Sequence, residues 1–468
     1  MKELKRRLET FSFYDHSGIE KHLEDMAEKG WLLKEINRFT WVYRRTQPKK
    51  LHFAVTYYPK ASEFDPEPLE GQLVYRDYSA HSGWKFICSS AQMQIFCNEE
   101  ETPVPMETDP VVEVQTIHKA AKKGFLLSYF ILLGLSVLQA ALFVSRLLGD
   151  PIGLLSSTTQ LATGFCWALL FLLCVVELGG YYRWHRKAIK AAENGEFLDT
   201  RSHTLFQKII LAAAIIALIY VFINLISVGN RMMLTIYTLM LAYMITLIVV
   251  VNAVKKFMKR KKASRTANLT VTLIVDFVLA FAMMAAITFG TLKATQVGLF
   301  NPGAETYEHN GSTWIIYQAE LPLSVEDLQD VKFDGYLREN RHSESIFLGQ
   351  KVVWQHPRRD IDTPVNVPDL KYTLTIIKVP ALYDVCKERI LNRRSDTVVE
   401  EGIIFVDHYE KIDATPWLAE EAYQLHWSEG ILNKYFLCYE DRIIEIDFDW
   451  EPTEEQMRIV AEKLAFVD

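Results

Sequence analysis

The sequence of 468 residues lacks most of the patterns that point to a reaction. Its six cysteines are too few for a disulfide framework, although a bond between Cys386 and Cys438 stays open. The histidines lack zinc spacing, and no P-loop, G-x-S-x-G, H-E-x-x-H or dinucleotide fingerprint occurs. The net charge of −7 leaves no basic surplus for nucleic acid. We therefore expect no enzyme, no cofactor, no metal and no nucleic-acid partner.

A secretory signal is also missing, since the basic start Met1–Tyr14 leads into charged residues and no apolar run follows it. What the chain does have is long apolar segments, each able to cross about 30 Å of hydrocarbon. The five segments are Phe125–Leu148, Leu161–Tyr181, Phe206–Val228, Met232–Val254 and Leu269–Leu292. The third has no polar stripe at the helical period, which disfavours a buried helix of a soluble core. We predict a membrane unit over residues 124–292, with four spans as the alternative because Asp276 interrupts the fifth segment.

Basic residues occupy alternate gaps between these segments. Residues 182–205 and 255–268 are rich in Lys and Arg, and so are residues 119–123 before the first span, whereas residues 149–160 have none. Cytoplasmic loops carry such an excess. The pattern predicts a multi-pass protein of the cell membrane with a cytosolic N-terminus and, after five spans, an extracytoplasmic C-terminus. The first span would act as an uncleaved signal-anchor, and the lipid bilayer is the first expected partner.

We predict a small cytosolic α+β domain over residues 1–110, followed by a linker over residues 111–123. Ser17 can cap a helix that ends at Gly30, and strands and a second helix follow. The order of helix, Gly-Trp and strand occurs twice, at Gly30-Trp31 and at Gly83-Trp84, which suggests a pseudo-repeat.

The stretch FSFYDHSGIEKHLEDMAEKGWLL, the aromatic strands up to VTYYP, and YRDYSAHSGWKFICSSAQMQIF carry a resemblance over about residues 8–100. The region resembles the bacterial family called domain of unknown function 2812. The resemblance implies a cytosolic module joined to several membrane spans, often encoded beside a PadR-type regulator. The family has no established activity, so no catalytic residue carries over.

Residues 300–468 hold 17 basic and 33 acidic residues, and their alternating strands and capped closing helix predict an α+β extracytoplasmic domain. Four carboxylates alternate with apolar residues near its end: Glu445, Asp447, Asp449 and Glu451. On a strand they would share one face. That face fits a half-exposed edge strand, which we favour, or a site for a divalent cation.

Carboxylates within the predicted spans are the remaining candidates for function. Glu177 lies near one end of the second span, and Asp276 lies in the fifth. They could form a proton or cation relay. We favour a structural role, with Glu177 reaching the headgroups and Asp276 paired with Lys255, Lys256 or a helix amide.

The sequence thus favours a non-enzymatic membrane protein of the bacterial envelope that links an exterior sensing domain to a cytosolic interaction module in signalling. A protein partner, still unidentified, would bind that module. The alternatives are a transport component that uses Asp276 and Glu177, and an exterior metal-binding or hydrolytic domain.

Overall fold

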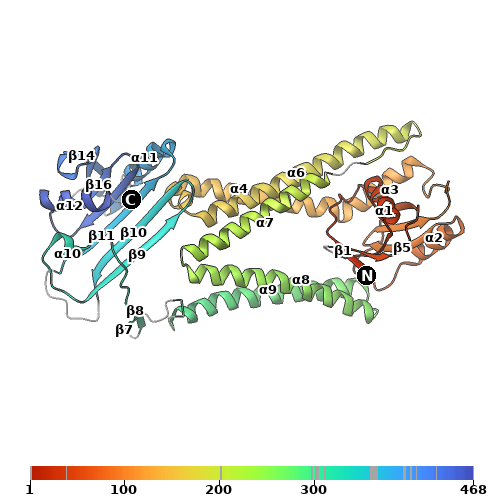
Figure 1. Ribbon diagram of the computed structural model, residues 1–468, viewed down its shortest axis with the longest axis horizontal. Coiled ribbons are helices and arrows are strands. Elements are labelled where there is room, and N and C mark those ends of the chain that lie inside the picture. Colours follow the sequence, from red (N-terminus) through yellow and green to blue (C-terminus); the bar gives the residue numbers. More distant parts are fainter. Residues whose placement is uncertain are drawn as a thin grey trace. The chain divides into compact units, whose positions relative to one another are not determined.

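The computed structural model describes residues 3–37, 40–200, 203–296, 299–300, 305–309, 312–358, 367–393, 397–400, 403–406, 408–427 and 430–466 (Figure 1). The chain forms two compact units. One comprises Met1–Ala141, Phe165–Ile219 and Tyr237–Ala286, and the other Leu142–Gly164, Tyr220–Ile236 and Ile287–Asp468. Since the boundaries fall inside the five long helices, each unit holds one soluble region together with one end of every long helix.

The first unit begins with two copies of one βαββ motif, the N-terminal module. The first copy is β1 (Leu4–Arg7), α1 (His16–Glu28), β2 (Trp31–Ile36) and β3 (Trp41–Arg45). The second is β4 (His52–Tyr57), α2 (Glu70–His81), β5 (Lys85–Ser90) and β6 (Met93–Asn98). Each forms an antiparallel three-stranded sheet with its last strand in the centre, in the orders β1-β3-β2 and β4-β6-β5. The predicted pseudo-repeat is therefore confirmed.

The glycine that ends each helix explains the repeated Gly-Trp pair. Gly30 has φ 77° and Gly83 has φ 81°, a left-handed conformation that residues with a Cβ adopt at a cost. The predicted cap at Ser17 is wrong, because the Asp15 side chain accepts the hydrogen bond from the Gly18 amide. Asp15 can do so because its side chain lies one helical turn before that amide.

One apolar core joins the two sheets to the helices that follow. Ile19, Leu23 and Met26 form the buried face of α1 and pack in the same cluster as Tyr43 and Val55. The cluster continues through α3 (Pro110–Lys123) to residues of the long helices, among them Phe125, Leu178, Tyr181 and Trp184. The module and these helix ends therefore share a core.

Five helices among the described residues are long and apolar enough to cross a membrane, the number that the sequence predicts. They are α4 (Phe125–Gly149), α6 (Thr158–Glu193), α7 (Thr204–Ser227), α8 (Arg231–Arg260) and α9 (Arg265–Gln296). A short helix, α5 (Pro151–Leu155), follows α4. Leu, Ile, Val and Phe side chains cover much of their outer surfaces, as contact with lipid requires. The helix α6 runs on through basic residues that follow the predicted span.

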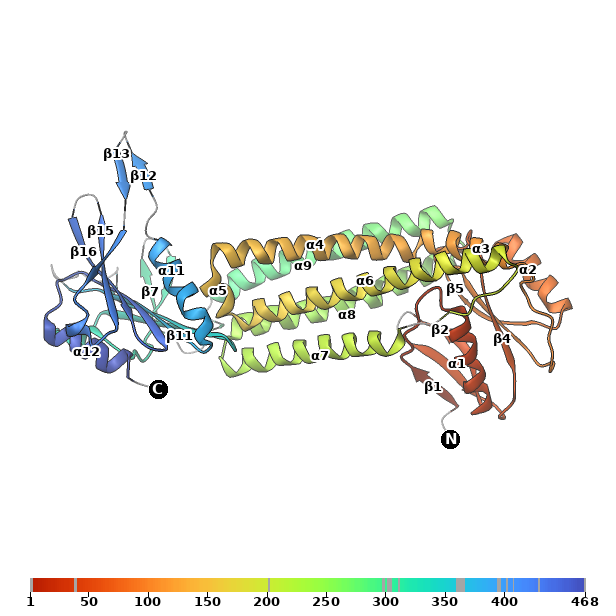
Figure 2. The ribbon, with the colours of Figure 1, turned by 90° about the horizontal axis from the view of Figure 1, so that it is seen from above.

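The C-terminal domain of the second unit is rich in β structure. Its seven-stranded antiparallel sheet has the order β14-β15-β16-β17-β11-β10-β9. The strands are β9 (Tyr336–Glu344), β10 (Leu348–Pro357), β11 (Leu370–Ile377), β14 (His408–Ile412), β15 (Glu421–Trp427), β16 (Gly430–Cys438) and β17 (Arg442–Phe448). Two further hairpins are β7 (Thr306–His309) with β8 (Ser312–Ile315), and β12 (Thr397–Glu400) with β13 (Ile403–Val406), which stands away from the sheet in Figure 2.

The two larger apolar clusters among the described residues of this domain lie on its sheet. The closing helix α12 (Glu454–Leu464) packs Val460 and Leu464 in one cluster with sheet residues such as Tyr372 and Ile446, beside the short helix α10 (Val325–Leu328) and the 3-10 turn η2 (Thr415–Trp417). The other cluster joins the sheet to α11 (Tyr383–Arg393), which follows the 3-10 turn η1 (Pro380–Leu382), and to Ile152 of α5. The domain thus buries part of the connection between two long helices.

Candidate functional site

Glu177 of α6 lies fully buried where the N-terminal module meets the long helices. Its carboxylate accepts hydrogen bonds from Ser12 Oγ at 2.7 Å and from Gln207 Nε2 at 2.7 Å. Gln207 Nε2 also donates to Ser12 Oγ at 3.3 Å. The prediction that Glu177 reaches the headgroups is wrong, because a residue 165 positions away in sequence covers it. A buried carboxylate needs such donors, so this contact fastens the module to α6 and α7.

Aromatic packing and a reciprocal pair of hydrogen bonds complete the same contact. Tyr14 is buried, lies stacked on Trp184 with the ring centroids 5.4 Å apart, and meets Tyr181 edge-on at the same distance. The Ser17 amide donates to Thr200 Oγ1 at 3.1 Å, and the Thr200 amide donates to Ser17 Oγ at 3.1 Å. Ser17, predicted as a helix cap, thus binds the segment between α6 and α7.

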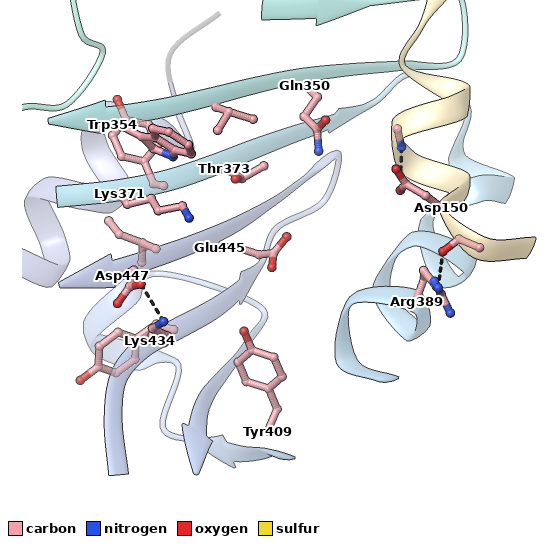
Figure 3. Close-up of a pocket in the computed structure, with 16 residues that line it drawn as sticks. Asp150, Gln350, Trp354, Lys371, Thr373, Arg389, Tyr409, Lys434, Glu445 and Asp447 are labelled. Atoms are coloured by element: carbon pink, nitrogen blue, oxygen red, sulfur yellow. Dashed lines mark hydrogen bonds and ion pairs between the residues drawn. The ribbon is translucent and has the colours of Figure 1, made fainter. Parts of the chain in front are cut away.

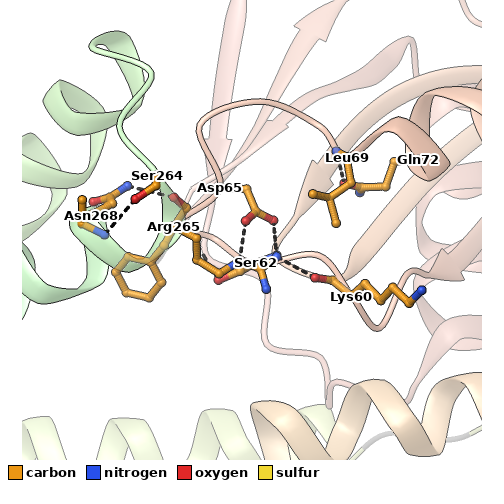
Figure 4. A network of polar contacts seen from close by, with 10 residues as sticks. Lys60, Ser62, Asp65, Leu69, Gln72, Ser264, Arg265 and Asn268 are labelled. Carbon is orange, nitrogen blue, oxygen red and sulfur yellow. Dashed lines mark hydrogen bonds and ion pairs between the residues drawn. The ribbon is translucent and has the colours of Figure 1, made fainter.

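A second contact joins the loop between β4 and α2 to the first turn of α9 (Figure 4). Arg265 Nε lies 2.5 Å from Asp65 Oδ1, and Arg265 Nη2 donates to Asp65 Oδ2 at 2.8 Å and to the Lys60 carbonyl at 2.7 Å. Asn268 is fully buried and its Nδ2 donates to the Phe64 carbonyl at 3.0 Å. Partial burial acts to raise the pKa of Asp65, but the hydrogen bonds from Arg265 and the Ser62 amide hold it below its usual value. We call these contacts the loop latch.

Two further ion pairs surround the loop latch. Lys255 Nζ lies 3.0 Å from Glu63 Oε1 and 4.6 Å from the centre of the Phe64 ring. Lys262 Nζ lies 2.7 Å from Glu67 Oε1, with both side chains mostly exposed. The basic segment 255–268, which helps to predict the topology, therefore also binds the acidic loop between β4 and α2. Its alternating acidic residues in the sequence were the available signal, but nothing local connects them to a turn some 200 residues later.

Asp276 of α9 is only partly buried, and its Oδ1 has no hydrogen-bond partner among the described residues. The predicted ion pair with Lys255 is wrong, since that lysine binds Glu63. Lys256 likewise forms no ion pair with Asp276 within the described ranges. No hydrogen bond or ion pair between described residues joins Asp276 to Glu177 either, so the two candidates of a relay are not brought together by direct contact.

The acidic residues of β17 occupy a central strand, so the edge-strand hypothesis is wrong. β17 pairs with β16 on one side and with β11 on the other. Asp447 forms an ion pair with Lys434 at 2.9 Å and lies opposite Lys371 across the ladder. Glu445 is on the same face, two residues earlier in the strand.

The other two predicted acidic residues follow the end of the strand. Asp449 accepts a hydrogen bond from the Asp369 amide at 2.9 Å, and Glu451 is exposed. In the part of the chain that the structure describes, no group of three or more His, Cys, Asp or Glu side chains could hold a metal ion. Cys386 and Cys438 are buried in one cluster and are not bonded to each other.

The comparisons with known proteins concern the module that makes these contacts. Residues 15–130 match the family described as protein of unknown function, DUF2812. The resemblance predicted from the sequence is confirmed. In this chain the DUF2812 region begins at the cap of α1, after β1, and runs through the rest of the first repeat, the second repeat and α3 into the first turns of α4. It therefore includes the helix that leads into the first long helix. No curated protein and no solved structure matches the chain.

Proposed function

We propose that this chain is an integral membrane protein of the bacterial cell envelope that couples its C-terminal domain to its DUF2812 module. The module would be cytosolic and the C-terminal domain extracytoplasmic, on the positive-inside argument and an odd number of spans. The lipid bilayer and a protein that binds the module would be its partners. The proposal requires no catalysis, cofactor or nucleic acid.

The observation that supports coupling is that both soluble regions make polar contacts with α6. In the second unit, Thr158 Oγ1, at the first residue of α6, donates to the Glu344 carbonyl at 2.6 Å. Ser345 Oγ donates to the Leu155 carbonyl just before α6. In the first unit, Glu177 of the same helix accepts from Ser12.

A continuous helix can transmit a displacement along its length because its backbone hydrogen bonds resist bending. α6 has 36 residues, a length of about 54 Å at about 1.5 Å per residue. A change at Glu344 would shift or rotate α6, and that movement would alter the hydrogen bonds of the buried Glu177. Transport stays the alternative, favoured by Asp276 Oδ1, which has no hydrogen-bond partner among the described residues and lies in a helix able to span the membrane.

Orientation is tested with reporter fusions in cells. A phosphatase fused after Asp468 should be active, and one fused after Lys262 should be silent, because phosphatase folds only outside the cytoplasm. An inactive C-terminal fusion, in a protein shown to be intact and inserted, would instead place the acidic domain inside with four spans.

Coupling is tested by hydrogen exchange on the full chain in nanodiscs. Thr158→Val removes the hydrogen bond to Glu344, and exchange should rise at the Ser17 and Thr200 amides, which are hydrogen-bonded within the other unit. Thr163→Val is the matched control, since among the described residues its hydroxyl bonds to the Thr159 carbonyl of its own helix alone. Equal exchange at these amides in both variants and the wild type would refute coupling through α6.

A further inference from the structure

The C-terminal domain contains a polar cavity of about 530 Å³ on one face of its sheet (Figure 3). All of its walls belong to the second unit. The strands β10, β11, β16 and β17 form the floor, and the end of α4, the start of α5 and α11 complete the wall. The opposite face of the sheet is the apolar one that packs with α12. A polar cavity of this size can hold a small molecule.

Six charged side chains line the cavity, three of each sign. They are Lys371, Arg389, Lys434, Asp150, Glu445 and Asp447. The pair Lys434 and Asp447 is an ion pair and neutralises itself. Lys371, Arg389 and Asp150 form no ion pair among the described residues, and these three charges decide what the cavity can bind.

The two remaining cations lack a carboxylate partner among the described residues. Lys371 lies opposite Asp447, but its ammonium stands 5.0 Å from the centre of the Trp354 ring. The guanidinium of Arg389 uses Nη2 to donate to the Gly149 carbonyl, and its Nε has no acceptor within the described ranges. Trp354 Nε1, in the same wall, is likewise a buried donor without an acceptor there. Buried donors are nearly always satisfied, so these point to an absent acceptor.

One anion of the cavity wall also lacks a cation. Asp150 Oδ1 accepts from the Gly153 amide and so caps α5, but no Lys or Arg of the described chain pairs with its carboxylate. Glu445 adds a second negative charge to the floor. A purely anionic ligand would be repelled by the Asp150 carboxylate, and a purely cationic one by Lys371 and Arg389.

We propose that this cavity binds a small zwitterion, whose acidic group lies at Lys371 and Arg389 and whose ammonium group lies at Asp150. A free amino-acid-like molecule and the headgroup of phosphatidylethanolamine share this chemistry. The inference deepens the proposed function, and it rests on that function only for the consequence of binding. The ligand would contact Arg389 and Asp150 directly beside the end of α4. Its binding would therefore change the contacts that the domain makes with the end of a long helix.

The test measures binding to the full chain in phosphatidylglycerol nanodiscs by calorimetry. Phosphoethanolamine and glycylglycine are the zwitterionic probes, and ethanolamine and acetate carry one charge each. At least one zwitterion should bind saturably and at least tenfold more tightly than either single-charge probe. Equal or undetectable binding of all four probes would overturn the proposal, unless the lipid arm below shows the headgroup in the site.

Two variants assign the binding to this cavity. Asp150→Asn removes the charge and keeps a good helix cap, and Lys371→Gln removes one cation; each should weaken binding at least tenfold. Their controls are Asp109→Asn, which makes the same change at the cap of α3, and Lys351→Gln, on the opposite face of β10. Wild-type affinity in both cavity variants would overturn the assignment.

The lipid arm separates the two sources. In phosphatidylethanolamine nanodiscs a headgroup in the cavity should protect β11 and β17 from hydrogen exchange, lower the affinity for phosphoethanolamine, and do neither in Asp150→Asn. No such change, with soluble binding intact, assigns the site to free zwitterions. Binding without altered exchange at Ser17 and Thr200 would refute coupling and leave the site standing, whereas coupling in Thr158→Val without any binding would do the reverse.

Discussion

The ion pair between Asp65 and Arg265 should contribute most of the free energy that holds the loop latch closed. Asp65 keeps 9% of its side-chain exposure and Arg265 keeps 42%. Hydrogen bonds to charged groups contribute roughly 1.5–3 kcal/mol, and solvent at the half-exposed guanidinium reduces that value. Arg265→Gln leaves a nearly buried carboxylate without its cation, so we expect a loss of about 2–3 kcal/mol in the free energy of loop opening.

A double-mutant cycle separates this pair from its surroundings. Asp65→Asn alone should cost about as much as Arg265→Gln, and the double variant should cost little more than either, a coupling energy of about 2 kcal/mol. The pair of Glu67 and Lys262 is the control, because its side chains are 60% and 75% exposed. Its cycle should give no more than about 0.5 kcal/mol.

The assay is hydrogen exchange of the segment 58–69 in the full chain in nanodiscs. When the loop closes faster than its open state exchanges, the exchange rate follows the opening equilibrium. A loss of 2 kcal/mol then corresponds to roughly thirtyfold faster exchange. Additive effects of the two single substitutions would refute the pairing, and so would equal coupling in the cycle of Glu67 and Lys262. High salt should accelerate exchange in the wild type less than in a latch made only of surface charges.

Substitutions at three other residues test polar groups that are buried or partly buried. Burial raises the pKa of Glu20 to about 8, so the folded module loses stability as pH rises from about 5 through 8. Glu20→Gln can still accept the hydrogen bond from the Val55 amide. This variant should therefore have a higher melting temperature than the wild type at pH 9 and the same melting temperature at pH 5. Glu177→Ala should cost about 3 kcal/mol, seen as faster exchange at Ser17, because it leaves the buried Ser12 hydroxyl without its acceptor and removes one bond of Gln207. An unchanged rate would mean that this contact does not hold the module. Asp276→Asn should leave membrane levels and any phenotype unchanged, and Asp276→Leu should raise the melting temperature slightly, since Oδ1 has no partner among the described residues; a lost phenotype at normal levels would favour the relay.

The five long helices could be predicted from the sequence because their signal is local. A helix in lipid satisfies its backbone within one segment, so an uninterrupted apolar run suffices to reveal it. The strands of the N-terminal module follow from alternation and from the two Gly-Trp pairs, because a left-handed glycine marks a helix end wherever it occurs. β1 escaped prediction since LKRR has no apolar alternation of its own and becomes a strand by pairing with β3.

The roles of the polar residues depended on contacts between distant parts of the chain. The acidic residues of β17 have the alternation of an edge strand, yet β16 and β11 flank them on both sides. Glu177 has the position of a residue that reaches the headgroups, yet Ser12 and Gln207 bury it. Apolar periodicity along the chain determined where the helices and most strands form. Only the tertiary structure decided which charges meet, because partners that lie 165 or 200 residues apart leave no local trace in the sequence.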